Sequence, residues 1–186
     1  MIRMLILNLL ITSISSGCRP SAPPATRGDL TLGLLKFLKE DDWNYDFKAG
    51  EDQDAVYFMY TGKQGRLSVT ILVHKALSII TIYSRLDLTV DPERRAQVAE
   101  FLHRANYGLL IGNFELDFTD GEVRYKSSID LEGLEATNVT FRNLLHANLS
   151  TADRYQRVFR RLVMGEGLTP EQAILQAEGP GLPGGP

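Results

Sequence analysis

The stretch FLHRANYGLLIGNFELDFTDGEVRYKSSIDLEG, residues 101–133, decides the fold class of this chain. Its first part continues a helical pattern of apolar residues, and we expect Gly108 to end that helix in the left-handed conformation that glycine accepts readily. Its second part changes to a period of two. This switch predicts a helix that is followed directly by β-structure.

The second half of the stretch is typical of a β-hairpin. Phe114, Leu116 and Phe118 alternate with acidic residues, which predicts a half-buried strand with its apolar side chains inward. Asp120 and Gly121 supply the positive φ angles of a tight turn. The alternation resumes on a return strand at Val123, Tyr125, Ile129 and Leu131. Two antiparallel strands are therefore expected here.

Before this stretch, the sequence predicts two helices and four strands. Leucines recur at helical spacing in residues 29–39, with Asp29 as the N-cap. Asp91, followed by proline and glutamate, opens a second helix, because aspartate caps a helix start and proline suits its first position. We expect Leu109 to belong to the buried stripe of this helix. Strand patterns lie between the two helices, at residues 43–47, 56–60, 67–73 and 79–83.

After the hairpin, the pattern is helical again. Residues 137–164 keep helical period, either as one long helix or as two that divide at Ser150 and Thr151. Thr169 and Pro170 begin a last short helix with capping-box spacing. The expected order is α-β-β-β-β-α-β-β-α-α, which indicates an α+β fold with an antiparallel sheet and flanking helices.

Composition limits the classes of function. The chain has 186 residues, of which 44% are hydrophobic, and this predicts a single domain with tails. Its formal net charge of -3 provides no general basic surface for a phosphate backbone, so we do not expect nucleic acid as a partner. The only cysteine is Cys18, which excludes an internal disulfide framework and any metal site made of several cysteines.

The two ends of the chain have their own compositions. Residues 1–18, MIRMLILNLLITSISSGC, resemble a bacterial lipoprotein signal, with Cys18 as the candidate lipidation site. The alternatives are an N-terminal extension without that role and a true start further downstream. Residues 19–28 are rich in proline, serine and alanine and are typical of a tether. Residues 179–186, GPGLPGGP, are expected to be a disordered tail of the domain at residues 29–178.

Two strands carry apolar residues on both faces. Tyr57 and Met59 oppose Phe58 and Tyr60, and Ile79 and Tyr83 oppose Ile80 and Ile82. A sheet with one face in water should instead alternate cleanly, so the second face of these strands is expected to be covered. A helix or loop of the same chain could cover it, or a homodimer or a bound peptide could. The candidate partner-binding residues are Tyr57, Met59, Ile79 and Tyr83.

We find no catalytic constellation in the sequence, and we expect neither a metal nor a cofactor. The acidic run at residues 40–42 fits a solvated bend better than a metal site, since no further acids are spaced for coordination. Lys63 after Gly62 fits a turn better than a phosphate loop, whose other residues are missing. If the protein were an enzyme, Glu100, His103 and Asp153 would be its starting set.

Several segments together resemble the YbjN family. These are DDW at residues 41–43, EFLHRANYGLLIGNFELDF at 100–118, DGEVRYKSSIDLEG at 120–133 and DRY at 153–155. The resemblance covers residues 29–178. It implies a fold like that of the type III secretion chaperones, a cytoplasmic location and a role as a sensory transduction regulator without an assigned enzyme activity. It supplies no catalytic residues.

The expected function is therefore a non-enzymatic, chaperone-like or regulatory module that binds a protein or peptide partner through apolar sheet surface. One alternative is an enzyme with a site of dispersed residues. Another is a membrane-anchored lipoprotein with a structural role, which would contact the membrane only through a lipid on Cys18.

Overall fold

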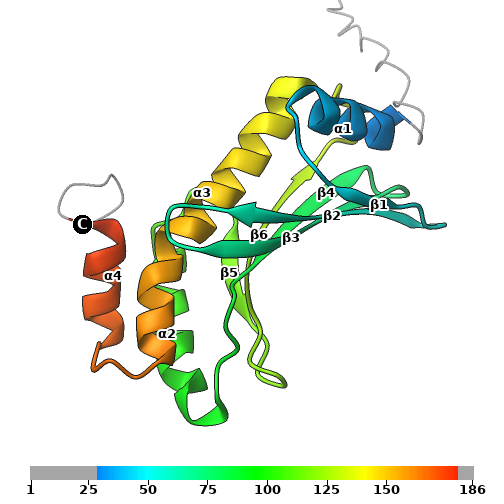
Figure 1. Cartoon of the computed structure of the whole chain (residues 1–186). Helices are drawn as coiled ribbons and strands as arrows, with labels where there is room; N and C mark the ends of the chain where they lie inside the picture. The colour runs from blue at the N-terminus through cyan, green and yellow to red at the C-terminus, as the bar shows by residue number, and fades with distance from the viewer. Residues whose placement is uncertain (1–28, 180–186) are drawn as a thin grey trace, which may run out of the picture.

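The structure is a computed structural model that describes residues 29–179, and its elements follow the predicted order (Figure 1). The predicted signal, tether and C-terminal tail, apart from Gly179, lie outside the described residues. The helices are α1 (Asp29–Glu40), α2 (Arg95–Tyr107), α3 (Asn138–Val163) and α4 (Pro170–Glu178), with a short 3-10 turn at Pro92–Arg94. The strands are β1 (Asp46–Lys48), β2 (Gln53–Thr61), β3 (Arg66–His74), β4 (Ile79–Arg85), β5 (Asn113–Leu116) and β6 (Val123–Asp130).

The six strands form one sheet in the order β1-β2-β3-β4-β6-β5, and every neighbouring pair is antiparallel. Strands β1 to β4 are consecutive neighbours because short turns join them. After β4 the chain leaves through α2 and returns as the edge strand β5, whose hairpin partner β6 then pairs with β4. The expected α+β fold with an antiparallel sheet and flanking helices is confirmed.

Strand register assigns each side chain to one of two sheet faces, because directly paired residues point the same way. We call the face that packs on α1 and α3 the inner face (Figure 1). Its centre is β3, where Leu67, Val69, Ile71 and Val73 are fully buried. Helix α3 lies along this face with its own apolar stripe. Burial of these two apolar surfaces against each other is the main stabilising contribution to the fold.

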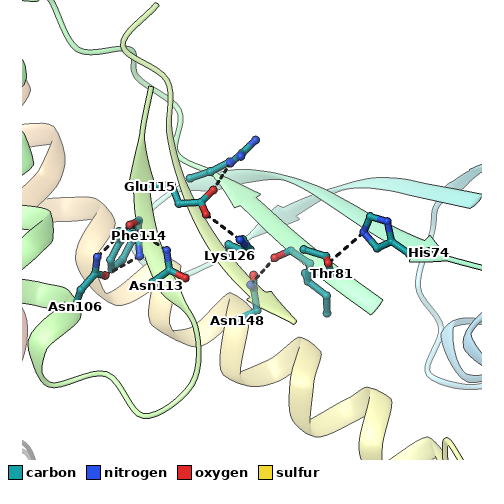
Figure 2. Close-up of polar contacts among 10 residues, drawn as sticks. His74, Thr81, Asn106, Asn113, Phe114, Glu115, Lys126 and Asn148 are labelled. Atoms are coloured by element: carbon teal, nitrogen blue, oxygen red, sulfur yellow. Dashed lines mark hydrogen bonds and ion pairs between the residues drawn. The ribbon is translucent and has the colours of Figure 1, made fainter. Parts of the chain in front are cut away.

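A polar cluster lies within this core. The side-chain amide of Asn148 on α3 donates to the Ser127 hydroxyl at 2.9 Å and to the carbonyl of Ile82 at 3.1 Å, and its oxygen accepts from Ser84 at 2.6 Å. Figure 2 shows Asn148 reaching from the helix to the sheet. These bonds fix the position of α3 over β4 and β6, because a buried polar group that loses its partners costs free energy.

The structure decides whether the long helix is divided and which residues cap the helices. Residues 138–163 form one continuous helix, so the alternative division at Ser150 and Thr151 is wrong. Thr137 caps this helix through a capping box with Thr140, and Thr169 caps α4 in the same way. Asp91, by contrast, precedes the 3-10 turn and not α2, and its side chain makes no cap bond. Its carbonyl accepts a hydrogen bond from the Arg94 amide.

The predicted conformation of Gly108 is wrong. Helix α2 ends at Tyr107, and Gly108 keeps a right-handed backbone with φ of -100°. Leu109, expected in the buried helical stripe, lies beyond the helix and is only partly buried. The left-handed glycine is Gly112, with φ of +80°, directly before β5. A Cβ at that position would collide with the carbonyl oxygen of Lys126, so the approach to β5 requires glycine there.

The inward position predicted for Phe118 is also wrong, since β5 ends at Leu116 and Phe118 is 60% exposed. Asp117 accepts from the Thr119 amide and Asp120 accepts from the Glu122 amide, so side-chain turns widen the hairpin loop. In this loop Gly121 has φ of +82°, whereas Asp120 does not have a positive φ. The hairpin itself is confirmed.

Candidate functional site

The four candidate partner-binding residues all lie on the outer face of the sheet, with Ile79 four residues away from Tyr83 along β4. Tyr57 pairs with Thr70 and Thr70 pairs with Tyr83, so the two tyrosines lie in one row across three strands. Met59 and Ile79 point to the same face by the same register. Within residues 29–179 the helices α1 and α3 pack on the inner face, and the outer face carries no helix (Figure 1). Tyr57 is 42% and Met59 is 55% exposed.

A shallow hollow of about 310 Å³ lies on this outer face. Tyr83 forms part of its wall, and the polar side chains of Ser68 and Thr70 lie beside it. Leu72, which pairs with Ala55 on β2, adds an apolar side chain to the lining of the hollow. The outer face therefore offers apolar contact area next to hydroxyl groups that can form hydrogen bonds, which is the mixture found at protein interfaces.

The β6 side of the outer face is charged. Glu115 on β5 accepts from Arg124 at 2.8 Å and from Lys126 at 3.1 Å, as Figure 2 shows for the labelled Glu115 and Lys126. Burial by itself would raise the pKa of Glu115, but the hydrogen bonds from Arg124 and Lys126 outweigh it and lower that pKa. Arg85 forms a longer ion pair with Glu122, at 3.6 Å.

The structure also exposes apolar residues at the end of α2 and in the loop that follows it, which sequence reasoning missed. Leu110 is 99% and Tyr107 91% exposed, and Ile111 is half exposed. This loop between α2 and β5 borders a second hollow of about 320 Å³ against the middle of α3. In the sequence, these apolar residues resemble a continuation of the apolar stripe of α2. The glycines at positions 108 and 112, which lie on either side of the segment, are the signal that could have identified it as a loop.

The starting set for an enzyme does not assemble. Glu100 forms an ion pair with Arg104 on the same helix at 2.8 Å, and His103 is exposed on α2. Asp153 is buried on α3, where it accepts hydrogen bonds from the backbone amides of Lys63 and Gln64 at 3.0 and 2.9 Å. Asp153 therefore holds the β2–β3 turn against α3, and its carboxylate is occupied by structural bonds.

The acidic run at residues 40–42 consists of Glu40, the last residue of α1, and of two aspartates in the turn that follows it. Asp41 accepts from the indole of Trp43 at 2.9 Å and from Arg142 on α3 at 3.3 Å. The hydrogen bond from Trp43 is the largest cause of the lowered pKa of Asp41. Over residues 29–179, no three histidine, cysteine or acidic side chains are grouped closely enough to hold a metal ion. None of the described helices has the length and apolar character needed to cross a membrane.

The fold and the outer face together define an α+β protein with helices on one side of an antiparallel sheet and an open face on the other. A family model described as "Putative bacterial sensory transduction regulator", YbjN, matches residues 33–161. The chain therefore belongs to the YbjN family, and the resemblance noted in the sequence is confirmed.

Among solved structures, the chain is similar to one in the "Crystal Structure of the ExsC-ExsE Complex". The two are 17% identical, the TM-score is 0.49, and the match covers 72% of this chain and 95% of the other. No curated protein matches this sequence significantly. Cys18 lies outside the described residues, so its lipidation stays a prediction.

Proposed function

We propose that this protein is a non-enzymatic binding module that holds a segment of a partner protein on the outer face of its sheet. The observation that carries this proposal is the convergence of Tyr57, Met59, Ile79 and Tyr83 on one face that no described helix covers. Membership of a family described as a regulator fits a protein that acts by binding another protein.

The exposed residues are of the types that contribute most at interfaces. Tyrosine and methionine are enriched at the centres of protein interfaces, where they bury much apolar area. Burial of apolar surface contributes about 25 cal/mol for each Å² removed from water. Tyr57 and Met59 stand two residues apart on β2, so one partner side chain can contact both.

The outer face is formed by strands whose opposite side is packed in the core. On β2, Phe58 lies between Tyr57 and Met59 and is buried in the core, where its ring centroid is 5.0 Å from that of Trp43. A preformed surface loses little conformational entropy on binding, so more of the contact energy is retained as affinity. This property favours a binding role for the face.

The proposal is tested by photocrosslinking followed by a binding measurement with purified components. A photoreactive residue replaces Tyr57 in the cells that make this protein, and the crosslinked partner is identified and purified. Its affinity for the wild type is then compared with that for Tyr57→Asp/Met59→Asp and for Ile79→Asp/Tyr83→Asp. Leu175→Asp is the matched control, because Leu175 is exposed on α4, away from the sheet.

We expect the two outer-face variants to weaken binding by at least about tenfold, because each buries charges in an apolar contact. The Leu175 variant should bind like the wild type. Circular dichroism verifies that each variant is folded. Unchanged affinity in both folded outer-face variants would refute the proposal. So would light scattering that shows a dimer for the wild type and a monomer for Tyr57→Asp/Met59→Asp, because a second copy of the chain would then cover this face.

A further inference from the structure

The outer face has different chemistry at its two sides. Met59, Ser68, Arg85 and Arg124 follow one another in a single row across β2, β3, β4 and β6, as the strand register shows. The row thus changes from apolar to basic from one side of the sheet to the other. The neighbouring row begins at Asp46 on β1 and then repeats this change from Tyr57 through Thr70 and Tyr83 to Lys126.

The basic side carries more positive than negative charge. We define the basic band as Arg66, Arg85, Arg124 and Lys126, all of which point to the outer face by register. Only Glu115 and Glu122 pair with members of this band, through the three ion pairs of Arg85, Arg124 and Lys126. Arg66 is exposed and forms no ion pair within the described part of the chain.

This local excess contrasts with the charge of the whole chain, which is -3. The negative net charge of the whole protein repels acidic molecules, whereas the basic band attracts them locally. A second copy of the chain would present the same positive band. Charge complementarity instead favours a partner that carries carboxylates.

The distance between Met59 and the basic band sets the length of the partner segment that can contact both. Two strand spacings separate Met59 from Arg85, which is about 10 Å. An α-helix spans that distance in about six residues, and an extended chain spans it in about three. The hollow beside Tyr83 lies between the two sides and can receive a side chain from the middle of such a segment.

We propose that the partner segment is amphipathic and acidic, with apolar side chains over Tyr57 and Met59 and carboxylates over the basic band. This inference rests on the proposed function and specifies the chemistry of the partner. The carboxylates pair with Arg66 and Arg85, which are the most accessible cations of the band. Arg124 and Lys126 remain paired with Glu115 and hold the edge of the site.

The test measures how tightly the full-length protein binds two synthetic helical peptides. Both peptides carry a leucine stripe, which is followed about six residues later by a run of glutamates in one and by a run of lysines in the other. Dissociation constants are measured by fluorescence anisotropy at low and high salt. The variants are Arg66→Glu/Arg85→Glu and the control Arg154→Glu/Arg157→Glu, which reverses two exposed arginines on α3.

We expect the glutamate peptide to bind at least about tenfold more tightly than the lysine peptide at low salt, with a smaller difference at high salt. The Arg66/Arg85 variant should lose this preference, and the α3 control should keep it. Anionic phosphatidylserine vesicles serve as a third probe and should not compete with the glutamate peptide.

Three results would overturn the inference. Equal binding of both peptides that still requires Tyr57 and Met59 would leave the proposed function intact and remove the acidic partner. Competition by the anionic vesicles would assign the basic band to a lipid surface. Failure of both peptides to bind would also reject the inference, and the crosslinking experiment would then decide the proposed function on its own.

Discussion

The guanidinium carbon of Arg124 lies 4.3 Å from the centroid of the Tyr83 ring. This contact joins the apolar side of the outer face to its basic band. Arg124 is held there by Glu115, so the cation, the ring and the carboxylate form one connected group on β4, β5 and β6. The surface chemistry of the outer face is therefore fixed by contacts within the domain.

The first prediction concerns this group. Arg124→Met should lower the free energy of unfolding by about 1 kcal/mol, because it removes a cation–π contact and a partly exposed ion pair. It should also raise the pKa of Glu115, which then accepts only from Lys126. Urea unfolding measures the first effect, and an NMR titration of the Glu115 carboxyl measures the second. Arg157→Met is the control, and an unchanged Glu115 pKa would contradict the coupling.

The second prediction concerns the β2–β3 turn. Asp153→Ala should destabilise the protein by about 2 kcal/mol, because the Lys63 and Gln64 amides lose a charged acceptor. Gly62→Ala should also destabilise, since its Cβ would collide with the Asp153 carboxylate. Hydrogen exchange should become faster at the Lys63 and Gln64 amides in Asp153→Ala. Unchanged exchange there would show that this carboxylate does not hold the turn.

The third prediction concerns the buried amide of Asn148. Asn148→Leu should cost about 3 kcal/mol, because it leaves Ser84, Ser127 and the Ile82 carbonyl without their partner in the core. The triple variant Ser84→Ala/Ser127→Ala/Asn148→Leu should recover part of this loss, since two of the unpaired groups are gone. Urea unfolding of the single and triple variants measures the difference. A triple variant less stable than the single one would reject the explanation.

The fourth prediction concerns pH. Asp54 forms an ion pair with Lys75 at 2.8 Å and accepts from Thr31 on α1 at 2.8 Å. Burial would raise the pKa of Asp54, but these partners outweigh it, so the folded pKa lies below the ordinary value of 3.8. As the pH falls, the Asp54 carboxylate is therefore protonated at a higher pH in the unfolded chain than in the folded protein. The stabilisation is therefore complete above the unfolded pKa and is lost as pH falls from about 5 through the folded pKa.

Replacement of Asp54 tests this pH dependence. Asp54→Asn should lower stability at pH 7 by about 2 kcal/mol, because Lys75 loses its anionic partner. Between pH 5 and 3, the free energy of unfolding of this variant should also change less with pH than that of the wild type, since the titrating group is gone. Urea unfolding at a series of pH values gives both curves. Parallel curves for the two proteins would contradict the assignment to Asp54.

Much of the fold could be predicted from local patterns. Leu67, Val69, Ile71 and Val73 alternate strictly, and the strand they predict is the centre of the inner face. Thr169 predicts the start of α4 through its capping box. Such signals are local, because periodicity and caps depend on residues only a few positions apart.

The misplaced details have a common cause. Gly108 and Phe118 both lie where an element ends, and the end depends on contacts that are distant in sequence. The tight approach of Gly112 to the carbonyl of Lys126 determines where β5 begins. The turns formed by the Asp117 and Asp120 side chains determine where the pairing of β5 with β6 ends.

The sequence by itself determined the element order, the α+β class and the presence of apolar residues on both sides of two strands, because each follows from local spacing. Only the tertiary structure decided that Tyr57, Met59, Ile79 and Tyr83 share one face without a helix, and that Glu100, His103 and Asp153 do not meet. The physical reason is register and layer packing. Pairing between strands sets which side chains are neighbours, and the single long helix α3 can cover only one side of the sheet.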